Sequence, residues 1–276
     1  MTAILIVAVA MMPNVAKAAV GDYTGTHWDT AFTGNAGLRG ITWDGTYFWA
    51  TDTEDDEVYK YNADGSSASF SFDTAAYGAT NPGGIVFDGT YLWVTDYSLD
   101  EVLKFNTSGV YQSSSWDTAI TGNFEPRGIV WDGTYFWLGS TTSTVYFTPG
   151  TYKHNAAGTY LSVFWSTVGE GLLYFYGLAW DGTYFWAVGG QEHKVYKYNA
   201  DGSTASFSFD TSTETSGVNS NPYGITYDGV SFWVTDSTDD EVYKYEAPSG
   251  TWPPWGEEPV VSASAPFRRQ RIIFIR

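Results

Sequence analysis

The sequence predicts an all-β protein built from five copies of one unit. Of its 276 residues, 43% are hydrophobic, 18% are aromatic and only 16% are charged, and 30 are glycine. Such a composition is typical of short, packed strands joined by tight turns. The stretch ITWDGTYFWATD (41–52) recurs four more times with small changes, which places its aspartate at Asp44, Asp88, Asp132, Asp181 and Asp228. Successive subtraction gives spacings of 44, 44, 49 and 47 residues, the period of four-stranded propeller blades.

Unit one shows the four strands expected in each copy. Residues 40–43 form the first strand, and Asp44-Gly45 then makes a two-residue hairpin turn, because glycine accepts the positive φ that such a turn needs. Residues 46–51 form the second strand, residues 57–62 the third, and residues 67–74 the fourth. Strands two and three lack a clean polar/apolar alternation. This is expected where a blade is covered on both faces by its neighbours.

The two ends of the repeat region predict how the ring closes. The fifth copy stops after its third strand, whereas residues 25–35 (GTHWDTAFTGN) match the fourth-strand segment SSSWDTAITGN at 113–123. We therefore expect a five-bladed β-propeller of four-stranded blades, in which the N-terminal strand completes the last blade and closes the ring. Closure removes free sheet edges that would otherwise pair with other chains.

The copies also carry a family pattern. Residues 81–109 (NPGGIVFDGTYLWVTDYSLDEVLKFNTSG) and 221–250 (NPYGITYDGVSFWVTDSTDDEVYKYEAPSG) resemble NHL-type propeller repeats, and the resemblance covers about residues 37–250. Two departures stand out: Asp-Glu replaces the family's usual basic residue before the third strand, and the family is usually six-bladed. Proteins similar to it include binding scaffolds, lactonase-like hydrolases and a peptide-amidating lyase. The resemblance thus implies the fold and leaves the function open.

The flanking segments predict an exported protein. An apolar run at 3–12, then Pro13 and Ala16-Lys17-Ala18, has the pattern of a signal peptide, although no basic residue precedes the run. A mis-assigned start or a short peripheral anchor are the alternatives. We expect a signal peptide at 1–18, the propeller at 19–250, a Pro-rich linker at 251–266 and a basic, apolar tail at 267–276. The expected location is secreted or on an extracytoplasmic surface.

Charge restricts the partners. The formal net charge is −18, and residues 19–267 alone hold 8 basic and 31 acidic residues, a net charge of −23. Nucleic acid is excluded as a partner by repulsion, and anionic membrane is disfavoured. The tail reverses this sign, so Arg268, Arg269 and Arg271 are predicted to bind a partner and tether the ring to a larger assembly, such as a cell envelope or virion surface. A disordered tail is the other interpretation.

Two arginines define the best candidate ligand site. Arg39 and Arg127 share one repeat position, just before the first strand, where the other copies have Gly83, Tyr176 and Tyr223. We expect this position to ring the channel mouth, where two arginines and two tyrosines present donors and ring faces to a carboxylate or a sugar. Alternatively, each arginine pairs with an acid such as Asp52 or Asp96. His193 joins the candidates because it replaces Asp56 of unit one.

Acidic loops raise the possibility of calcium. Asp52, Asp96 and Asp236 start such loops in units one, two and five, whereas Gly139-Ser140 and Gly189-Gly190 replace the Thr-Asp pair in the other two units. Calcium binds clustered carboxylate oxygens, so these aspartates are candidate ligands. The alternative is that they cap turns through their own backbone. No other cofactor is predicted.

Common catalytic patterns are missing from the sequence, which has no cysteine, no GxSxG and no HExxH. The main hypothesis is therefore a non-catalytic, exported binding or scaffold propeller. It would recognise a glycan, peptide or partner protein at the channel mouth and at the blade-three loop (143–150). The alternatives are a calcium-dependent, lactonase-like hydrolase or lyase with its site in the central channel, and a purely structural surface protein.

Overall fold

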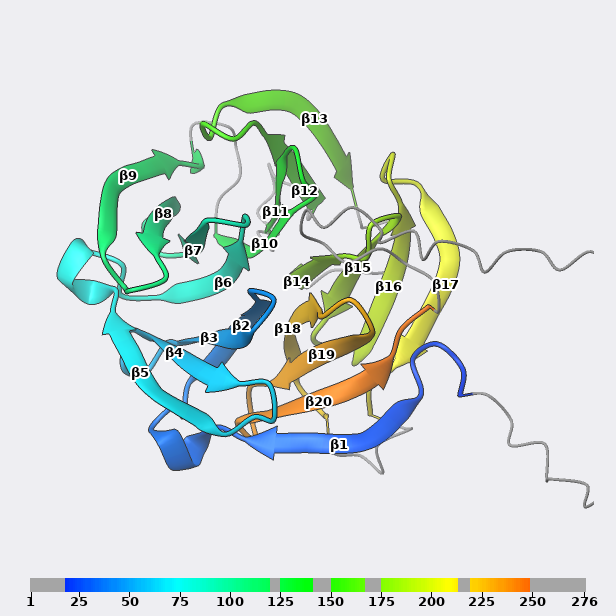
Figure 1. Cartoon of the computed structure of the whole chain (residues 1–276). Helices are drawn as coiled ribbons and strands as arrows, with labels where there is room; N and C mark the ends of the chain where they lie inside the picture. The colour runs from blue at the N-terminus through cyan, green and yellow to red at the C-terminus, as the bar shows by residue number, and fades with distance from the viewer. Residues whose placement is uncertain (1–17, 120–124, 141–149, 167–174, 213–218, 249–276) are drawn as a thin grey trace, which may run out of the picture.

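Five antiparallel sheets of four strands each surround a central axis (Figure 1). The computed structural model describes residues 18–119, 125–140, 150–166, 175–212 and 219–248. The all-β, five-bladed prediction is confirmed. Residues 1–17 of the predicted signal peptide (1–18) lie outside the described residues, as do the whole predicted linker (251–266) and the tail (267–276) with Arg268, Arg269 and Arg271. No helix in the described ranges is long and apolar enough to cross a membrane.

The strands follow the chain from the innermost to the outermost position in blades one to four. Blade one consists of β2 (Leu38–Trp43), β3 (Tyr47–Asp52), β4 (Glu57–Asn62) and β5 (Ser67–Asp73). Blade two consists of β6 (Pro82–Phe87), β7 (Tyr91–Asp96), β8 (Glu101–Asn106) and β9 (Tyr111–Asp117). Blade three consists of β10 (Pro126–Trp131), β11 (Phe136–Ser140), β12 (Gly150–His154) and β13 (Tyr160–Ser166). Blade four consists of β14 (Phe175–Trp180), β15 (Tyr184–Gly189), β16 (Lys194–Asn199) and β17 (Thr204–Asp210).

Blade five joins strands from opposite ends of the described chain. It contains β18 (Pro222–Tyr227), β19 (Ser231–Asp236) and β20 (Glu241–Glu246), and its outermost strand is β1 (Tyr23–Asp29). Cross-strand partners such as Trp28 with Val242 fix the register. The N-terminal strand therefore completes the last blade, as the matching segments predict. Short 3-10 helices, η1 (Ala31–Thr33) and η2 (Ala75–Tyr77), lead from an outer strand to the next inner one.

The repeated Asp-Gly turn is a structural clamp. One carboxylate oxygen of Asp44 accepts the backbone N–H groups of Thr46 and Tyr47, and the other accepts the indole N–H of Trp49 at 2.7 Å. The same bond recurs in every blade, between Asp88 and Trp93, Asp132 and Trp137, Asp181 and Trp186, and Asp228 and Trp233. Each carboxylate thus fixes a turn and a buried tryptophan together. The repeated stretch at 41–52 is scaffold.

Most lysines of the propeller are also engaged within the blades. The ammonium group of Lys60 lies 3.7 Å from the centroid of the Tyr47 ring and 4.8 Å from that of Trp49. Equivalent stacking holds Lys104, Lys153, Lys197 and Lys244 on aromatic rings of their own blades. These cation–π contacts hold five of the lysines against their own blades. These lysines therefore belong to the scaffold, unlike the arginines described below.

A ring of glycines sets the distance between the blades. The inner strands β2, β6, β10, β14 and β18 contact one another in a closed circle, and each carries a glycine at the point of closest approach, namely Gly40, Gly84, Gly128, Gly177 and Gly224. A Cβ atom on Gly84 would lie 2.5 Å from the carbonyl oxygen of Arg127, in the next blade. Any side chain at these positions would push neighbouring backbones apart.

A threonine bridges neighbouring blades beside this ring. The Thr51 hydroxyl accepts the N–H of Gly40 at 2.8 Å and donates to the carbonyl oxygen of Gly83, in blade two, at 2.7 Å. Thr235 makes the same pair of bonds and thereby ties blade five to Arg39 of blade one. Strand register places Gly139 at this position in blade three and Val188 in blade four. The Thr-Asp pair of blade four is therefore replaced by Val188-Gly189, which corrects the expected Gly189-Gly190.

The outer strands protect their own edges. At one equivalent position in four of them, a serine has a left-handed backbone: Ser69, Ser113, Ser162 and Ser206, with φ between 51° and 59°. Gly25 holds this position in β1, with φ of 83°. In each blade the register between the third and outermost strands shifts there. A bulge of this kind interrupts the ladder of free hydrogen-bonding groups and so disfavours pairing with another chain.

One core position of blade three holds a histidine where the other blades have a tyrosine or a phenylalanine. Strand register matches His154 with Tyr61, Phe105, Tyr198 and Tyr245 of the other blades. His154 is fully buried and its ring packs 4.9 Å from that of Trp116. Neither ring nitrogen reaches hydrogen-bond geometry with a described residue. Burial lowers the pKa of His154 to about 4, against a weak opposing contact with the Tyr152 backbone.

The glycine ring predicts that Gly84→Ala destabilises the protein. Its Cβ would meet backbone atoms of blade three, which cannot rotate away, so we expect a loss of about 3 kcal/mol in the free energy of unfolding. Urea denaturation measures it. The control is Gly83→Ala, one residue away, where the nearest atom is the Thr95 hydroxyl at 3.3 Å. Equal losses in the two variants would contradict the proposed closeness of the blades.

The buried imidazole predicts an acid-sensitive core. His154 is neutral when folded, so the unfolded chain, with an ordinary pKa near 6.5, binds more protons between about pH 6.5 and 4. Stability is therefore lost as pH falls, by about 2 kcal/mol at pH 5 from this group. We expect His154→Phe to remove that loss, as judged by urea denaturation at pH 7.5 and pH 5. Parallel pH profiles for the two proteins would refute this origin.

Candidate functional site

The candidate site lies where the five inner strands begin, an end of the channel termed here the upper mouth. The structure brings four of the predicted residues together there, Arg39, Arg127, Tyr176 and Tyr223, and adds Tyr97. These five side chains form the mouth cluster. Arg39, Arg127, Tyr176 and Tyr223 all come from the repeat position before the inner-strand glycine, whereas Tyr97 follows strand β7.

Arg127 is held on several sides within this cluster. Its guanidinium carbon lies 4.4 Å from the centroid of the Tyr97 ring and 5.7 Å from that of Tyr176. One nitrogen donates to the Tyr223 hydroxyl at 3.0 Å and another contacts the Glu125 carboxylate at 3.3 Å. Burial works against the charge, but Tyr223 and Glu125 outweigh it and raise the pKa of Arg127 above its usual value. Arg127 therefore organises the cluster.

Arg39 is placed differently. Its guanidinium carbon lies 5.2 Å from the centroid of the Tyr223 ring, and one nitrogen donates to its neighbour's carbonyl oxygen, on Leu38, at 3.0 Å. Arg39 is half-buried and makes no ion pair with any described acid. Since a guanidinium group has five N–H donors in a planar fork, Arg39 keeps donors available for a planar anion. Tyr223 itself is buried and stacks on Tyr176, with ring centroids 4.6 Å apart and an interplanar angle of 8°.

Glycines make room for the tyrosines. A Cβ on Gly190 would collide with the Tyr176 ring, so the loss of larger residues from this loop of blade four allows that ring to lie flat. In blade two, Gly83 leaves space that Tyr97 fills, with its ring edge 3.4 Å from where a Cβ would be. Tyr97 donates its hydroxyl to Asn81 at 2.9 Å. Tyr97 was not predicted from the sequence. The available signal was that blade two has a glycine, Gly83, where the other blades have an arginine or a tyrosine.

The aspartates considered as partners for the arginines have other bonds. Asp52 is fully buried, and its two oxygens accept four backbone N–H groups, from Ala36, Gly37, Glu54 and Asp55. Asp96 and Asp236 likewise accept backbone N–H groups from their own loop and the preceding one. Neither arginine pairs with Asp52 or Asp96; Arg127 pairs with Glu125 instead.

The calcium hypothesis has limited support from this geometry. The carboxylates of Asp52, Asp96 and Asp236 face N–H donors, whereas a calcium ion needs their lone pairs. Among the described residues, no group of three or more acids and histidines is arranged to hold a metal ion. Calcium binding stays a prediction for calorimetry to test.

One acid near Arg39 has an unusual proton affinity. Burial raises the pKa of Asp240 to about 6, the carboxylates of Asp52 and Glu54 add to the rise, and the charge of Arg39 and the Leu38 backbone oppose it. Asp240 lies in the turn between β19 and β20 with φ of 55°. Its charge near the upper mouth therefore changes within an accessible pH range.

His193 lies in the corresponding turn of blade four. Its φ is 52°, close to the values of Asp56, Asp100 and Asp240 at the same position. The His193 carbonyl oxygen accepts the Thr211 hydroxyl at 3.0 Å. This backbone role is shared by the equivalent residues, since Thr74 donates to Asp56 and Thr118 to Asp100. None of the described contacts joins His193 to the mouth cluster, and its ligand-binding role stays a prediction.

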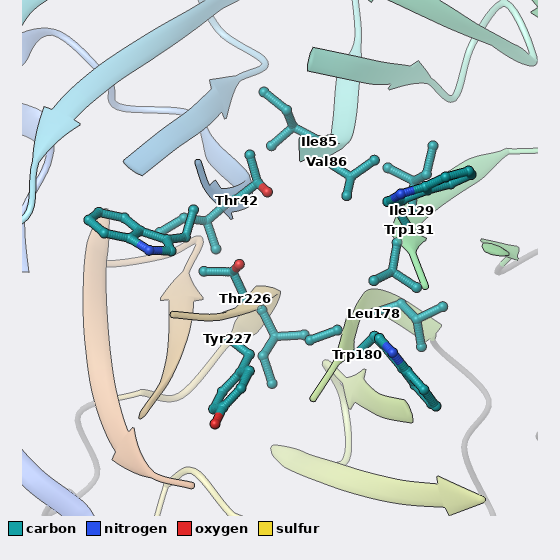
Figure 2. Close-up of a pocket in the computed structure, with 14 residues that line it drawn as sticks. Thr42, Ile85, Val86, Ile129, Trp131, Leu178, Trp180, Thr226 and Tyr227 are labelled. Atoms are coloured by element: carbon teal, nitrogen blue, oxygen red, sulfur yellow. The ribbon is translucent and has the colours of Figure 1, made fainter. Parts of the chain in front are cut away.

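The central channel is narrow. Figure 2 shows its lower part, where Thr42, Val86 and Thr226 surround the central space and the rings of Trp131, Trp180 and Tyr227 lie farther out. The volume left there is about 30 Å³, enough for about two water molecules. At the level of the glycine ring, with Arg127 and Tyr176 above, about 10 Å³ is left. A substrate the size of a lactone or sugar does not fit in this channel.

Part of the predicted site cannot be placed. The blade-three loop at 143–150 lies outside the described residues except for Gly150, the first residue of β12.

Comparisons with known proteins show the fold and no closer relationship. No protein-family model and no curated protein matches the chain. Among solved structures, the glutaminyl cyclase of Myxococcus xanthus has a TM-score of 0.64 at 12% identity, over 80% of this chain and 94% of that one. A chain of the nidogen/laminin complex has a TM-score of 0.50 at 17% identity, over 72% of each chain. The chain therefore has the architecture of a propeller repeat protein.

The contacts of Arg127 predict that its role is structural. Lysine cannot reproduce the planar fork that reaches Tyr223 and Glu125 from one position between two rings. We expect Arg127→Lys to lower the free energy of unfolding by about 1–2 kcal/mol. Arg39→Lys is the matched control, with a change below about 0.5 kcal/mol, because a half-exposed residue with few partners is replaced. Urea denaturation distinguishes the two; a larger loss for Arg39→Lys would reverse these assignments.

Proposed function

We propose that this protein is a non-catalytic binding propeller whose upper mouth recognises a carboxylate group of a peptide or partner protein. The observation that carries the proposal is Arg39. In a chain with a net charge of −18, an arginine would readily find an acidic partner, yet this one is held over the Tyr223 ring with no described ion pair. A guanidinium group kept in place by an aromatic face and left open on its donor side suits bidentate capture of a carboxylate.

The surrounding residues support this assignment. Tyr176 and Tyr223 stack beside Arg39, and Arg127 holds the pair by donating to the Tyr223 hydroxyl and lying 5.7 Å from the centroid of the Tyr176 ring. A ligand therefore meets a preorganised surface, which lowers the entropic cost of binding. The narrow channel favours binding at its mouth over the alternative of a hydrolase or lyase inside it. The likeness to a chain of the nidogen/laminin complex is consistent with a protein partner.

The setting of the site is part of the same proposal. The Asp-Gly and aromatic-strand pattern of the copies supports NHL-type blades, and the segment 1–18 supports export. Arg268, Arg269 and Arg271, in an otherwise acidic chain, support a tethering role for the tail. The blade-three loop at 143–150 is proposed to add specificity, because it is an insertion relative to the other copies.

Peptide binding tests the proposal. A library of immobilised tetrapeptides is prepared twice, with free and with amidated C-termini, and probed with the full chain; the best binder is then measured by calorimetry. We expect free carboxylates to be preferred and Arg39→Ala to weaken binding about 10- to 100-fold, the value of a charge-assisted hydrogen bond. Binding is also expected to weaken as pH rises through about 6, since Asp240 then gains a negative charge near the ligand.

Lys194→Ala and Asp240→Asn are the controls. Lys194 is a half-buried cation at the start of β16, and its removal is expected to leave the affinity unchanged. Asp240→Asn should remove the pH dependence. The proposal fails if amidated and free peptides bind equally, if Arg39→Ala binds as well as the native chain, or if no library member binds.

A further inference from the structure

Blade two has aromatic or apolar residues at three surface positions where blade one has polar ones. The equivalent pairs are Tyr77 and Thr33 in the 3-10 helices, Leu99 and Asp55 in the loops after the second strands, and Tyr111 and Ser67 at the start of the outermost strands. Blades four and five also have an acid at the Leu99 position, Glu192 and Asp239. The fold therefore accepts polar residues at these positions.

The three residues of blade two lie together on the surface and are called here the blade-two patch. The centroids of the Tyr77 and Tyr111 rings are 4.8 Å apart. Leu99 reaches the end of the same 3-10 helix, since its Cδ1 atom is 3.8 Å from where a Cβ on Gly78 would lie. The exposed fraction is 45% for Tyr77 and 44% for Leu99, and Tyr111 is half-buried. Two large side chains of the patch are thus open to solvent.

Packing inside the blade accounts for only part of the patch. In blade one the Thr33 hydroxyl is hydrogen-bonded to the Tyr61 hydroxyl at 2.9 Å. In blade two the equivalent of Tyr61 is Phe105, which is fully buried, and the Tyr77 ring lies 5.8 Å from it between centroids. Tyr77 therefore has a partner in the core. Core packing does not explain Leu99, because other blades have an acid at its position.

Acidic residues without ion pairs border the patch. Asp100 follows Leu99 in the chain, and the Asp73 carboxylate accepts a backbone N–H of η2 at 3.1 Å. Glu101 and Asp117 face each other across β8 and β9, and none of the four acids pairs with a described cation. Burial raises the pKa of Asp100, and nearby carboxylates, Asp117 among them, add to the rise against an opposing backbone N–H. This border favours a cationic partner.

One segment of the chain has the complementary chemistry. Residues 267–276 (FRRQRIIFIR) combine four arginines with a run of four large apolar residues at 272–275. The only other arginines are Arg39 and Arg127, in the mouth cluster. An anionic membrane or a nucleic acid would be repelled by the carboxylates around the patch. The basic and apolar tail is thus the occupant that suits this surface best.

The described part of the chain ends away from this patch. Pro248 follows β20, whose last residue, Glu246, pairs with Ser231 at the end of blade five opposite to the upper mouth. Contacts between the inner strands make blades one and three the neighbours of blade two, so blade five is not adjacent to it. The linker at 251–266 is Pro-rich, and such segments are extended and semi-rigid. This arrangement favours the patch of a second copy over that of the same ring.

We propose that the tail of one copy of this chain binds the blade-two patch of another. The apolar run at 272–275 covers Leu99 and Tyr77, and the arginines face the acids around them. Because this contact joins two different surfaces, it can repeat from copy to copy. The inference rests on the tethering role proposed above for the tail and names copies of this chain as the assembly. It does not involve Arg39.

Sedimentation velocity of the full chain tests the proposal. We expect oligomers whose size grows with concentration at low salt, and a shift toward monomer in about 0.5 M NaCl, which screens the charges. The patch variant carries Tyr77→Thr, the residue of blade one, and Leu99→Asn, which matches the shape of Asp55 without adding charge. We expect it to raise the dissociation constant at least about tenfold. The tail variant, with Arg268→Glu, Arg269→Glu and Arg271→Glu, should not associate.

A mixture of the two variants identifies the contact. The tail variant keeps a native patch and the patch variant keeps a native tail, so an equimolar mixture is expected to form a one-to-one complex although neither variant associates alone. Light scattering measures its mass. A dimer formed patch to patch would give no complex in this mixture, and a tail bound to its own ring would leave the native chain monomeric. Either result overturns the proposal.

Two control variants make the result specific. Val230→Thr removes a valine that is 73% exposed in the Asp-Gly turn of blade five, where the other blades have threonine, and should leave association unchanged. Arg39→Ala should associate like the native chain, so failure here and failure of the mouth site are distinguishable. Thermal melting of the patch variant checks its fold. The proposal is also overturned if a folded patch variant associates as strongly as the native chain.

Discussion

The close approach of five inner strands at one ring of glycines is the constraint on which the rest of the structure depends. At Gly84 the backbone of one blade lies against the carbonyl oxygen of the next, with no room for a side chain. This spacing lets Thr51 and Thr235 bridge neighbouring blades and brings the residues just before the glycines together at the upper mouth. The same closeness leaves a channel with room for only about two water molecules in its wider part.

We therefore propose that the residues that bind a ligand lie at positions where the copies differ. The repeated residues are committed to the scaffold, as the bond from Asp44 to Trp49 and the stacking of Lys60 on Tyr47 illustrate. At the variable position before the inner-strand glycine, Arg127 is held by Tyr223 and Glu125, whereas Arg39 has few described partners, and we propose that Arg39 serves recognition.

Much of the fold and part of the candidate site could be predicted from the sequence, because residues at equal repeat positions take equivalent places in the ring. The Asp-Gly turns predicted the blades, the match between residues 25–35 and 113–123 predicted the closure by β1, and equal repeat positions predicted that Arg39, Arg127, Tyr176 and Tyr223 would meet. Tyr97 could not be foreseen, because it enters the cluster from a different repeat position to fill the space beside Gly83. The different roles of Arg127 and Arg39 could not be predicted either, because they depend on which side chains each arginine contacts in the folded protein.

The pairing of β1 with β20 has a consequence for how the protein is made. Blades one to four each contain only consecutive strands, so each can form soon after its own residues leave the ribosome. Blade five cannot, because β1 must wait for a partner that is synthesised roughly two hundred residues later. Until then β1 and the unfinished sheet both expose edges that invite pairing with other chains. The pairing of β1 with β20 is therefore the folding step at which the chain is most exposed to aggregation. The rate of this one step sets how much of the newly made protein closes into a ring.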